Sequence, residues 1–262
     1  MTQSALDKAR IRHSFAAAAV SYDGVAALQR QVGRALLQRF PLADGDGVVL
    51  DLGSGTGFLT AQIKQSGVAD KLVAVDLALP MLELSRYKYP ALAIGHVCAD
   101  VQQLPLRGGS VAQIYSNLAL QWLTELPLVF DEWKRVLQPG GQLVFATFGP
   151  QTLKELKRAW AAVDDAVHVN DFIGADAIVR ALEMARFASI QCEVDLHICR
   201  YPSVMALMRE LKALGAHNVN SGRKRESTTK GALQQMIEHY QQQMLGKTIQ
   251  ASYEIIMVRA VA

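Results

Sequence analysis

The sequence lacks a long hydrophobic run and has few cysteines. No uninterrupted apolar stretch in its 262 residues approaches the roughly 20 that a membrane span needs. The basic N-terminus is not followed by the apolar stretch of a secretory signal. Cys98, Cys192 and Cys199 lack the paired spacing of a metal site. We therefore expect a cytoplasmic protein with structural thiols, no metal centre and no membrane partner.

The chain also lacks a strong excess of charge. Its 27 Lys and Arg against 24 Asp and Glu leave a net charge of +3 at pH 7, which does not require a nucleic-acid partner. The basic run at 223–225 has no interleaved aromatic residues on which bases would stack. Half of the residues are hydrophobic, so a large core can be buried, and the length suits one elaborated domain.

A glycine-rich turn follows the first predicted strand. Val48 to Leu52 predict a buried strand, Gly53 to Gly57 a turn, and Phe58 the start of a helix. Phe58 stands where a dinucleotide fingerprint needs its last glycine. Asp51 would repel a diphosphate about 4 Å away by roughly 4 kcal/mol at an effective dielectric near 20. S-adenosylmethionine, which carries an ammonium and a sulfonium and no phosphate, is therefore the favoured ligand.

The string DLGSGTG at residues 51–57 resembles the first motif of the class I, Rossmann-like methyltransferases, over about the first 150 residues. The resemblance implies an α/β fold with a seven-stranded, mostly parallel sheet and helices on both faces. Further strands are predicted near 72–76, 93–99, 111–115, 142–148, 190–198 and 248–258, alternating with helices. The expected parts are an N-terminal helical cap or lid (1–45), a cofactor-binding core (46–200), a helical insertion for substrate (201–247) and the last core strand (248–262). Within the cap, two helices are predicted, separated by a break at Ser21 to Gly24.

The ends of the predicted strands supply most candidate cofactor contacts. Asp76 closes the second strand, where a carboxylate can accept both ribose hydroxyls; capping the next helix remains the alternative reading. By resemblance to the family, Asp100 accepts from the adenine amino group and a neighbouring apolar residue flanks the ring. The predicted cofactor-binding residues are Asp51, Gly53, Ser54, Gly55, Gly57, Asp76, Leu77, Asp100, Val101, Asn117 and Trp122.

Four segments spread over nearly the whole chain narrow the resemblance: 15–22, 116–122, 168–172 and 208–216, the last followed by Gly222-Arg223. Together they resemble the malonyl-acyl-carrier-protein O-methyltransferases of biotin synthesis. The resemblance implies esterification of the free malonyl carboxyl, which initiates pimeloyl formation. The implied partner is an acyl-carrier protein carrying malonyl-phosphopantetheine, or malonyl-CoA. The Asn/Asp-Pro-Pro-aromatic run of enzymes that methylate amino groups is absent after the fourth strand.

The predicted reaction needs no general base, because a carboxylate with a pKa of about 4 is already ionised at neutral pH. Tyr22 is a candidate for positioning the methyl transfer, with core packing as its alternative. Arg209, Lys212 and Arg223, and outside the matching segments Arg12, are candidate cations for the malonyl carboxylate. A solvated surface role is open for each cation. Methylation of another small acid or a quinone precursor, a nicotinamide-dependent oxidoreductase and a non-catalytic binding protein are the alternative functions.

Overall fold

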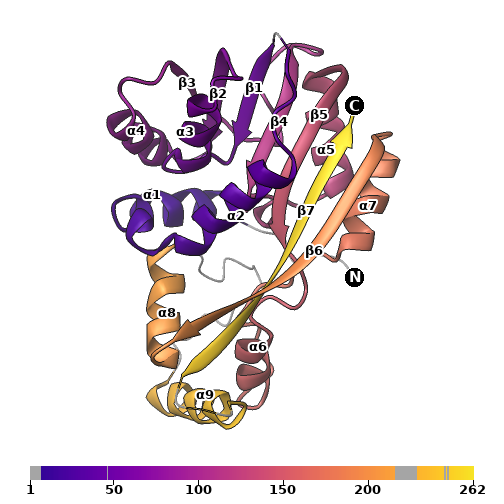
Figure 1. Cartoon of the computed structure of the whole chain (residues 1–262). Coiled ribbons are helices and arrows are strands. Elements are labelled where there is room, and N and C mark those ends of the chain that lie inside the picture. The colour runs from indigo at the N-terminus through magenta and orange to yellow at the C-terminus, as the bar shows by residue number, and fades with distance from the viewer. Residues whose placement is uncertain (1–6, 46, 216–228, 245, 247) are drawn as a thin grey trace.

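A seven-stranded sheet runs through the molecule (Figure 1). The computed structural model describes residues 7–45, 47–215, 229–244, 246 and 248–262. Strands β1 to β5 pair in parallel, and β7 is antiparallel to both β5 and β6, in the order β3-β2-β1-β4-β5-β7-β6. This confirms the predicted mostly parallel sheet. The strands are β1 Val48–Leu52, β2 Lys71–Asp76, β3 Ile94–Cys98, β4 Val111–Asn117, β5 Leu137–Phe148, β6 Ala188–Tyr201 and β7 Ile249–Val261.

Helices cover both faces of the sheet, as predicted. Buried side chains of α2 and α3 pack with Val49 and Tyr115 on one face, while α5 and α7 pack with Leu50 and Ile114 on the other. Neighbouring residues of each strand thus point into different cores, as the strand period requires. The helices are α1 Lys8–Val25, α2 Ala27–Arg39, α3 Phe58–Gln65, α4 Leu79–Lys88, α5 Leu126–Val136, α6 Lys154–Ala161, α7 Ala175–Met184, α8 Val204–Ala213 and α9 Lys230–Gln242, with a 3-10 turn at Leu120–Trp122.

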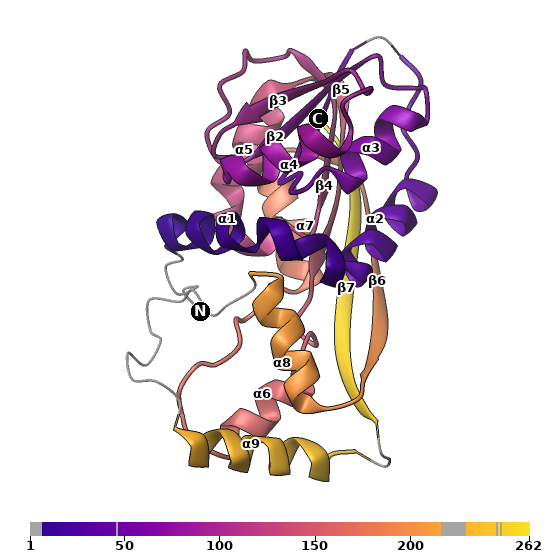
Figure 2. The same ribbon diagram turned by 90° about the vertical axis from the view of Figure 1, so that its left-hand side faces the viewer.

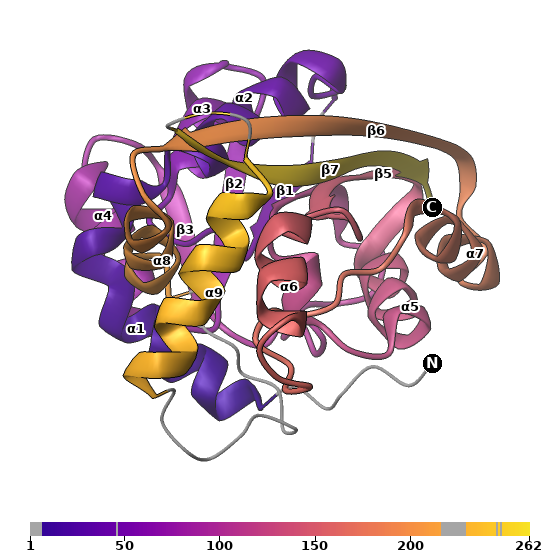
Figure 3. The ribbon, with the colours of Figure 1, turned by 90° about the horizontal axis from the view of Figure 1, so that it is seen from below.

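Strands β6 and β7 are longer than predicted and carry a second group of helices at their far end (Figures 1 and 3). The sequence predicted strands over 190–198 and 248–258, and the structure extends β6 to Tyr201 and β7 to Val261. Helices α6, α8 and α9 lie around this extension. Tyr240 of α9 and Val204 of α8 are fully buried in the same hydrophobic cluster as Tyr115 of β4. The predicted insertion, residues 201–247, contains α8 and α9.

Helix α1 crosses the carboxyl ends of the parallel strands (Figure 2). The predicted break at Ser21 to Gly24 was wrong, because the helix begins after the capping residue Asp7 and continues to Val25. Ala19 packs against Met81 of α4, and Tyr22 packs against the same cluster. This tertiary contact outweighs the weak helix propensity of residues 21–24.

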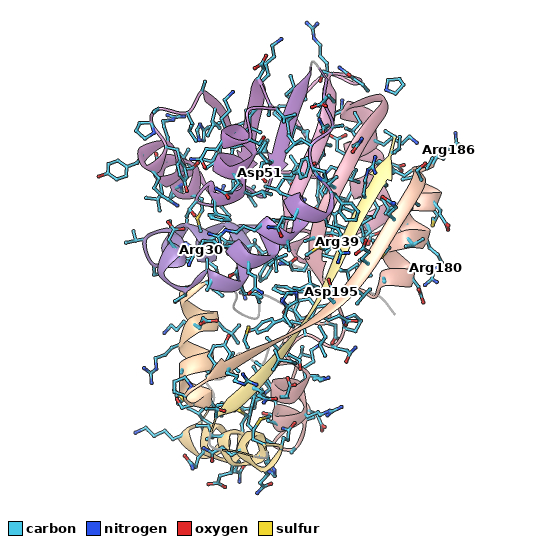
Figure 4. The ribbon with its side chains drawn as sticks, in the orientation of Figure 1. Arg30, Arg39, Asp51, Arg180, Arg186 and Asp195 are labelled. Carbon is cyan, nitrogen blue, oxygen red and sulfur yellow. The ribbon has the colours of Figure 1, made fainter. Side chains whose placement is uncertain are left out.

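Strand β6 lies at one end of the sheet and pairs, among the described strands, only with β7. Three of its alternate side chains, Val194, Leu196 and Ile198, are close to half exposed. On its other face, Arg39 of α2 pairs with Glu193 at 2.8 Å and with Asp195 at 3.8 Å (Figure 4). Among the described residues, no helix has the length and apolar character that a membrane crossing requires.

Candidate functional site

The glycine turn after β1 packs so tightly that two of its glycines cannot be replaced without a clash. Gly53 and Gly57 adopt φ angles of 70° and 82°, a region that favours glycine. A Cβ on Gly53 would lie 2.4 Å from the Cβ of Ala119, and one on Gly57 would lie 2.1 Å from Ser85 Oγ. Gly55, at φ 53°, has open space around the corresponding position. The turn therefore presents bare backbone to a ligand at Gly55.

A pocket lies at the carboxyl ends of β1, β2 and β4, beneath α1. Figure 2 shows this helix across the strand ends. The glycine turn forms one wall, and α1 supplies the roof. The lining residues are Lys8, Ile11, Phe15, Tyr22, Gly53, Gly55, Asp76, Leu77, Met81, Asp100, Val101, Gln102, Asn117, Leu118, Ala119, Trp122 and Leu123. Most of the predicted cofactor contacts, together with Tyr22, thus surround one cavity.

Three predicted cofactor contacts, Asp51, Ser54 and Gly57, are not part of the lining. Asp51 is 1% exposed, and its carboxylate accepts a hydrogen bond from Thr60 Oγ1 in α3 (Figure 4). Burial raises the pKa of Asp51 to about 7, although the hydrogen bond from Thr60 partly offsets this effect. The side chain therefore supports the start of α3, and its contact with a ligand stays a prediction.

Asp76 is held at the end of β2 by two backbone amides. Its Oδ2 accepts from Gly55 N and its Oδ1 from Ala78 N, both at 2.8 Å. Burial raises the pKa of this carboxyl, while the two amide hydrogen bonds lower it. Helix α4 has Ala78 as its N-cap residue without a side-chain bond, so Asp76 does not cap it from the N-cap position. The carboxylate instead ties the glycine turn to β2 and borders the pocket.

Asp100 is engaged by the roof helix. Its Oδ2 accepts from Lys8 Nζ at 2.6 Å, and its Oδ1 accepts from Gln102 N at 2.9 Å. The Lys8 side chain is 48% exposed and that of Asp100 is 26% exposed. Since exposed ion pairs contribute little to stability, this pair is best understood as a contact that joins the start of α1 to the opposite rim of the pocket.

The other end of α1 is joined to the glycine turn through Asp23. Its Oδ1 accepts from Thr56 Oγ1 and its Oδ2 from Lys88 Nζ, each at 2.6 Å. Lys88 also donates to the Thr56 carbonyl at 3.2 Å. Between the two ends, Phe15 meets Trp122 edge to face, with ring centroids 5.3 Å apart. Helix α1 is therefore attached at both ends and in the middle.

Asn117, at the end of β4, and Tyr22, on α1, both line the pocket. Asn117 Nδ2 donates to the Gln29 carbonyl at 2.9 Å, and its buried Oδ1 has no partner among the described residues. Burial raises the pKa of Tyr22; Asp76 and Asp23 add to this effect, and Arg30 opposes it. The phenol is therefore protonated at neutral pH and can donate a hydrogen bond.

The predicted substrate cations lie outside the pocket lining. Arg209 and Lys212 are exposed on α8, and Arg12 is exposed on α1. Arg223 falls outside the described residues. Arg30, which the sequence did not indicate, is also outside the lining but lies close to the Asp23 end of α1. Its Nη1 donates to the Asp23 carbonyl at 2.7 Å, and it lies near the lining residue Tyr22. Figure 4 labels Arg30.

Several lining residues were missed from the sequence, among them Lys8, Ile11, Phe15 and Gln102. For three of these residues, the sequence does contain a pattern that could have identified them. Lys8, Ile11 and Phe15 follow helical spacing and continue to Tyr22, two turns further on, provided that the helix is unbroken. Gln102 carries no sequence signal, because its importance depends on how its side chain is held.

The pocket fits a nucleoside attached to an amino acid. Carboxylates of Asp76 and Asp100 lie near the β2 side, and the orphaned Asn117 oxygen offers an acceptor for an ammonium near β4. The open position at Gly55 leaves room for a ligand against the backbone. Within the described ranges, no group of three His, Cys, Asp or Glu residues is arranged to hold a metal ion.

Comparison with known proteins agrees with this geometry. Residues 50–145 match a family described as "Methyltransferase domain". Over 260 residues, the chain is 40% identical to the malonyl-[acyl-carrier protein] O-methyltransferase of Laribacter hongkongensis, covering 95% of this chain and 88% of the relative. The biotin biosynthesis bifunctional protein BioHC of Cellvibrio japonicus is 41% identical over 255 residues, covering 96% of this chain but only 50% of that longer relative.

Solved structures show the same fold. The chain matches a putative methyltransferase from Bacillus halodurans with a TM-score of 0.63 and 17% identity, over 88% of this chain and 98% of that one. A phosphoethanolamine N-methyltransferase of Haemonchus contortus, solved with S-adenosylhomocysteine, matches with a TM-score of 0.54 and 15% identity, over 87% of this chain and 52% of that one. These matches, with the strand order, confirm the class I methyltransferase fold.

Proposed function

The chain belongs to the malonyl-[acyl-carrier protein] O-methyltransferase family, and we propose that it methylates the free carboxylate of a malonyl group carried by an acyl-carrier protein. Its cofactor is S-adenosyl-L-methionine. The methyl ester formed would initiate pimeloyl formation in biotin biosynthesis. The observation that carries the proposal is a relationship of 40% identity that extends over most of both chains, beyond the shared cofactor-binding core.

In the proposed reaction, the main task of the protein is to position the substrate carboxylate relative to the methyl group. When bound, S-adenosylmethionine supplies a methyl group on a positively charged sulfur. The malonyl carboxylate is ionised at neutral pH, so no side chain has to remove a proton from it. Holding the carboxylate in line with the methyl carbon can contribute about 7 to 11 kcal/mol to lowering the barrier. The roof formed by α1 suits this task, because it covers the carboxyl ends of the strands that border the pocket.

We assign the following roles within this proposal. Gly53, Gly55, Asp76 and Asn117 hold the cofactor, and Tyr22 donates its protonated hydroxyl toward the substrate carboxylate. Because these residues border one pocket, they can contact a single ligand pair. Asp51, Ser54 and Gly57 would act from behind the glycine turn.

Arg30 is our candidate for the cation beside the malonyl carboxylate. Its guanidinium uses one N–H for the Asp23 carbonyl, and none of the ion pairs among the described residues includes it. We propose that the exposed Arg209 and Lys212, on the insertion 201–247, contact the carrier protein or its phosphopantetheine arm. A positively charged surface suits an acidic partner.

The direct test is transfer of a labelled methyl group to malonyl-acyl-carrier protein. The expected product is a methyl ester that mild alkali cleaves. Acetyl-acyl-carrier protein, which has no free carboxyl group, is the matched control and should remain unlabelled. Label transferred only to a phenol or quinone precursor, giving an ether that resists alkali, would contradict the proposal. Parallel reactions with malonyl-CoA measure whether the carrier protein is required.

A further inference from the structure

Leu118, the residue that follows β4, is buried in a backbone conformation that is unfavourable for leucine. Its φ is 53°, in the left-handed region that glycine, asparagine and aspartate enter more readily than other residues. The residue is buried and lines the pocket. A strained backbone of this kind persists only where its surroundings hold it. Neighbouring groups must therefore keep Leu118 in this conformation.

Hydrogen bonds fix the peptide groups on both sides of Leu118. Its amide nitrogen donates to the Ala146 carbonyl of β5 at 2.8 Å. Its carbonyl oxygen accepts from Nε2 of Gln121 at 2.6 Å. The first bond continues the backbone pairing of β4 with β5, whereas the second depends on a single side chain. Loss of the Gln121 amide would therefore release one side of Leu118 and leave the strand pairing in place.

The amide of Gln121 is oriented by Thr147 of β5. A carbonyl oxygen only accepts, so the nitrogen of this amide faces Leu118 and its Oε1 is left for a donor. Thr147 Oγ1 donates to that oxygen at 3.2 Å. Thr147 is buried, and its strand lies between β4 and β7 in the sheet. Thr147, Gln121 and Leu118 thus form a series of hydrogen bonds that runs from an interior strand to the pocket wall.

The conformation of Leu118 determines where its neighbours in the pocket wall lie. Asn117, directly before it, carries the buried acceptor Oδ1. Ala119, directly after it, packs against the glycine turn, since a Cβ on Gly53 would lie 2.4 Å from the Cβ of Ala119. Trp122 N donates to the Ala119 carbonyl at 3.0 Å. Because these neighbours also line the pocket, a change of backbone conformation at Leu118 would alter several ligand contacts together.

We propose that Gln121, oriented by Thr147, is a positioning residue that keeps the strained turn at Leu118 in the conformation that binds the cofactor. Gln121 is not among the residues that line the pocket, so it acts through the backbone of Leu118. The proposal concerns only the cofactor-binding form of the chain, whichever molecule accepts the methyl group.

The test measures two quantities: the dissociation constant of S-adenosylhomocysteine, by calorimetry, and the free energy of unfolding of the ligand-free chain, in urea. Gln121→Met keeps the length of the side chain and removes both of its hydrogen bonds. It should raise the dissociation constant about fivefold or more. A purely structural role would lower the free energy of unfolding and leave the affinity of the folded chain unchanged.

Thr147 provides a matched pair of variants that leave Gln121 in place. Thr147→Val removes the orienting hydroxyl with little change of shape and should raise the dissociation constant about two- to threefold. Thr147→Ser keeps the hydroxyl and should bind as tightly as the wild type. This pair also tests the proposal if Gln121→Met fails to fold.

Leu118→Gly tests the role of strain, because glycine adopts a positive φ at no steric cost. In that background the turn needs less support, so Gln121→Met should raise the dissociation constant only about twofold. The proposal is overturned if Gln121→Met changes the affinity of the wild-type chain less than fivefold, if its full effect persists with glycine at position 118, or if Thr147→Ser weakens binding as much as Thr147→Val. Since no methyl acceptor is present, failure of this test is independent of failure of the proposed methylation.

Discussion

At the scale of single residues, the sequence predicted that Asp51 contacts the cofactor, and in the structure its carboxylate contacts Thr60. Its charge predicted attraction to a positively charged ligand, yet its carboxylate meets Thr60 in a fully buried position. Sequence alone indicates that an acid stands beside the turn. It does not show which way the side chain points, because that depends on the packing of α3 against β1.

Asp51→Asn should become more stable relative to the wild type as the pH rises. The folded-state pKa of about 7 lies above the ordinary 3.8, so Asp51 favours folding fully below about pH 4, and this contribution is lost as the pH rises to 7. Three units correspond to about 4 kcal/mol at most. Chemical unfolding of both proteins without ligand, between pH 4.5 and 8, measures the difference. If the free energy of unfolding of Asp51→Asn, minus that of the wild type, fell as the pH rose, the prediction would be contradicted, because the folded protein would then favour the charged form of Asp51.

Arg30→Ala should weaken use of the malonyl substrate and leave cofactor binding unchanged. Loss of a hydrogen bond to a charged group, about 1.5 to 3 kcal/mol, corresponds to a fall of about 10- to 100-fold in kcat/KM. Arg180→Ala, an exposed arginine on α7, is the matched control (Figure 4). Steady-state kinetics with malonyl-acyl-carrier protein and calorimetry with S-adenosylhomocysteine give the two readouts. Equal loss in both would instead assign Arg30 to the fold of the roof.

At the scale of elements, two glycines with positive φ angles separate the effect of a steric clash from the effect of backbone strain. Gly57→Ala should unfold or strongly destabilise the chain, because the new methyl group would meet the buried Ser85 at 2.1 Å in addition to the strain of a positive φ. Gly67→Ala is the control: its φ is 77°, with open space around it. We expect about 1 kcal/mol for Gly67→Ala from strain alone. Thermal unfolding of the two variants checks this, and equal shifts would contradict it.

We expect the Lys8 end of helix α1 to move away from Asp100 when the cofactor dissociates. Lys8→Met removes the ion pair to Asp100, so dissociation of S-adenosylhomocysteine should become about 2- to 5-fold faster at low salt. The effect should vanish near 1 M salt, where screening extends only about 3 Å. Arg12→Met, on an exposed position of the same helix, is the control. Stopped-flow displacement measures both rates, and an effect independent of salt would argue against the ion pair.

The secondary structure was predictable wherever hydrophobic periodicity decided it. The strand, turn and helix from Val48 to Gln65 follow directly from the sequence. The continuity of α1 did not, because residues 21–24 resemble a turn when they are considered without α4 beneath them. That one error concealed the helical spacing by which Lys8, Ile11 and Phe15 reach the pocket. The pairing of Gln102 with Thr124 depends on two loops meeting, which no local pattern reports.

At the scale of the whole molecule, one hydrophobic cluster joins the cofactor core to the outer helices. It runs from Leu36 of α2 and Tyr115 of β4 to Trp160 of α6 and Tyr240 of α9. The sequence predicted an insertion but not this continuity. The prediction separated residues 201–247 from the core, whereas long strands β6 and β7 connect both groups of helices.

Because the cluster is continuous, α9 and β4 should lose protection from hydrogen exchange at the same denaturant concentration. Elements that share one packed core tend to open together as a cooperative unit. Exchange followed by mass spectrometry across a guanidinium series provides the measurement on the unmodified chain. The first turns of α1, attached through an exposed ion pair, should exchange earlier and serve as an internal reference. Loss of protection in α9 while β4 stays protected would show two independent units.

The outer strand β6 also has a bearing on how the protein behaves in concentrated solution. Backbone groups along its outward side have no neighbouring described strand, and Val194, Leu196 and Ile198 add an apolar stripe. Such an edge is a template on which a second copy can add its own strand. The acidic residues Glu193 and Asp195 alternate with that stripe, and Arg39 ties them to α2. The same ion pairs that fasten a helix to the sheet thus also interrupt the edge with charge, which opposes aggregation through it.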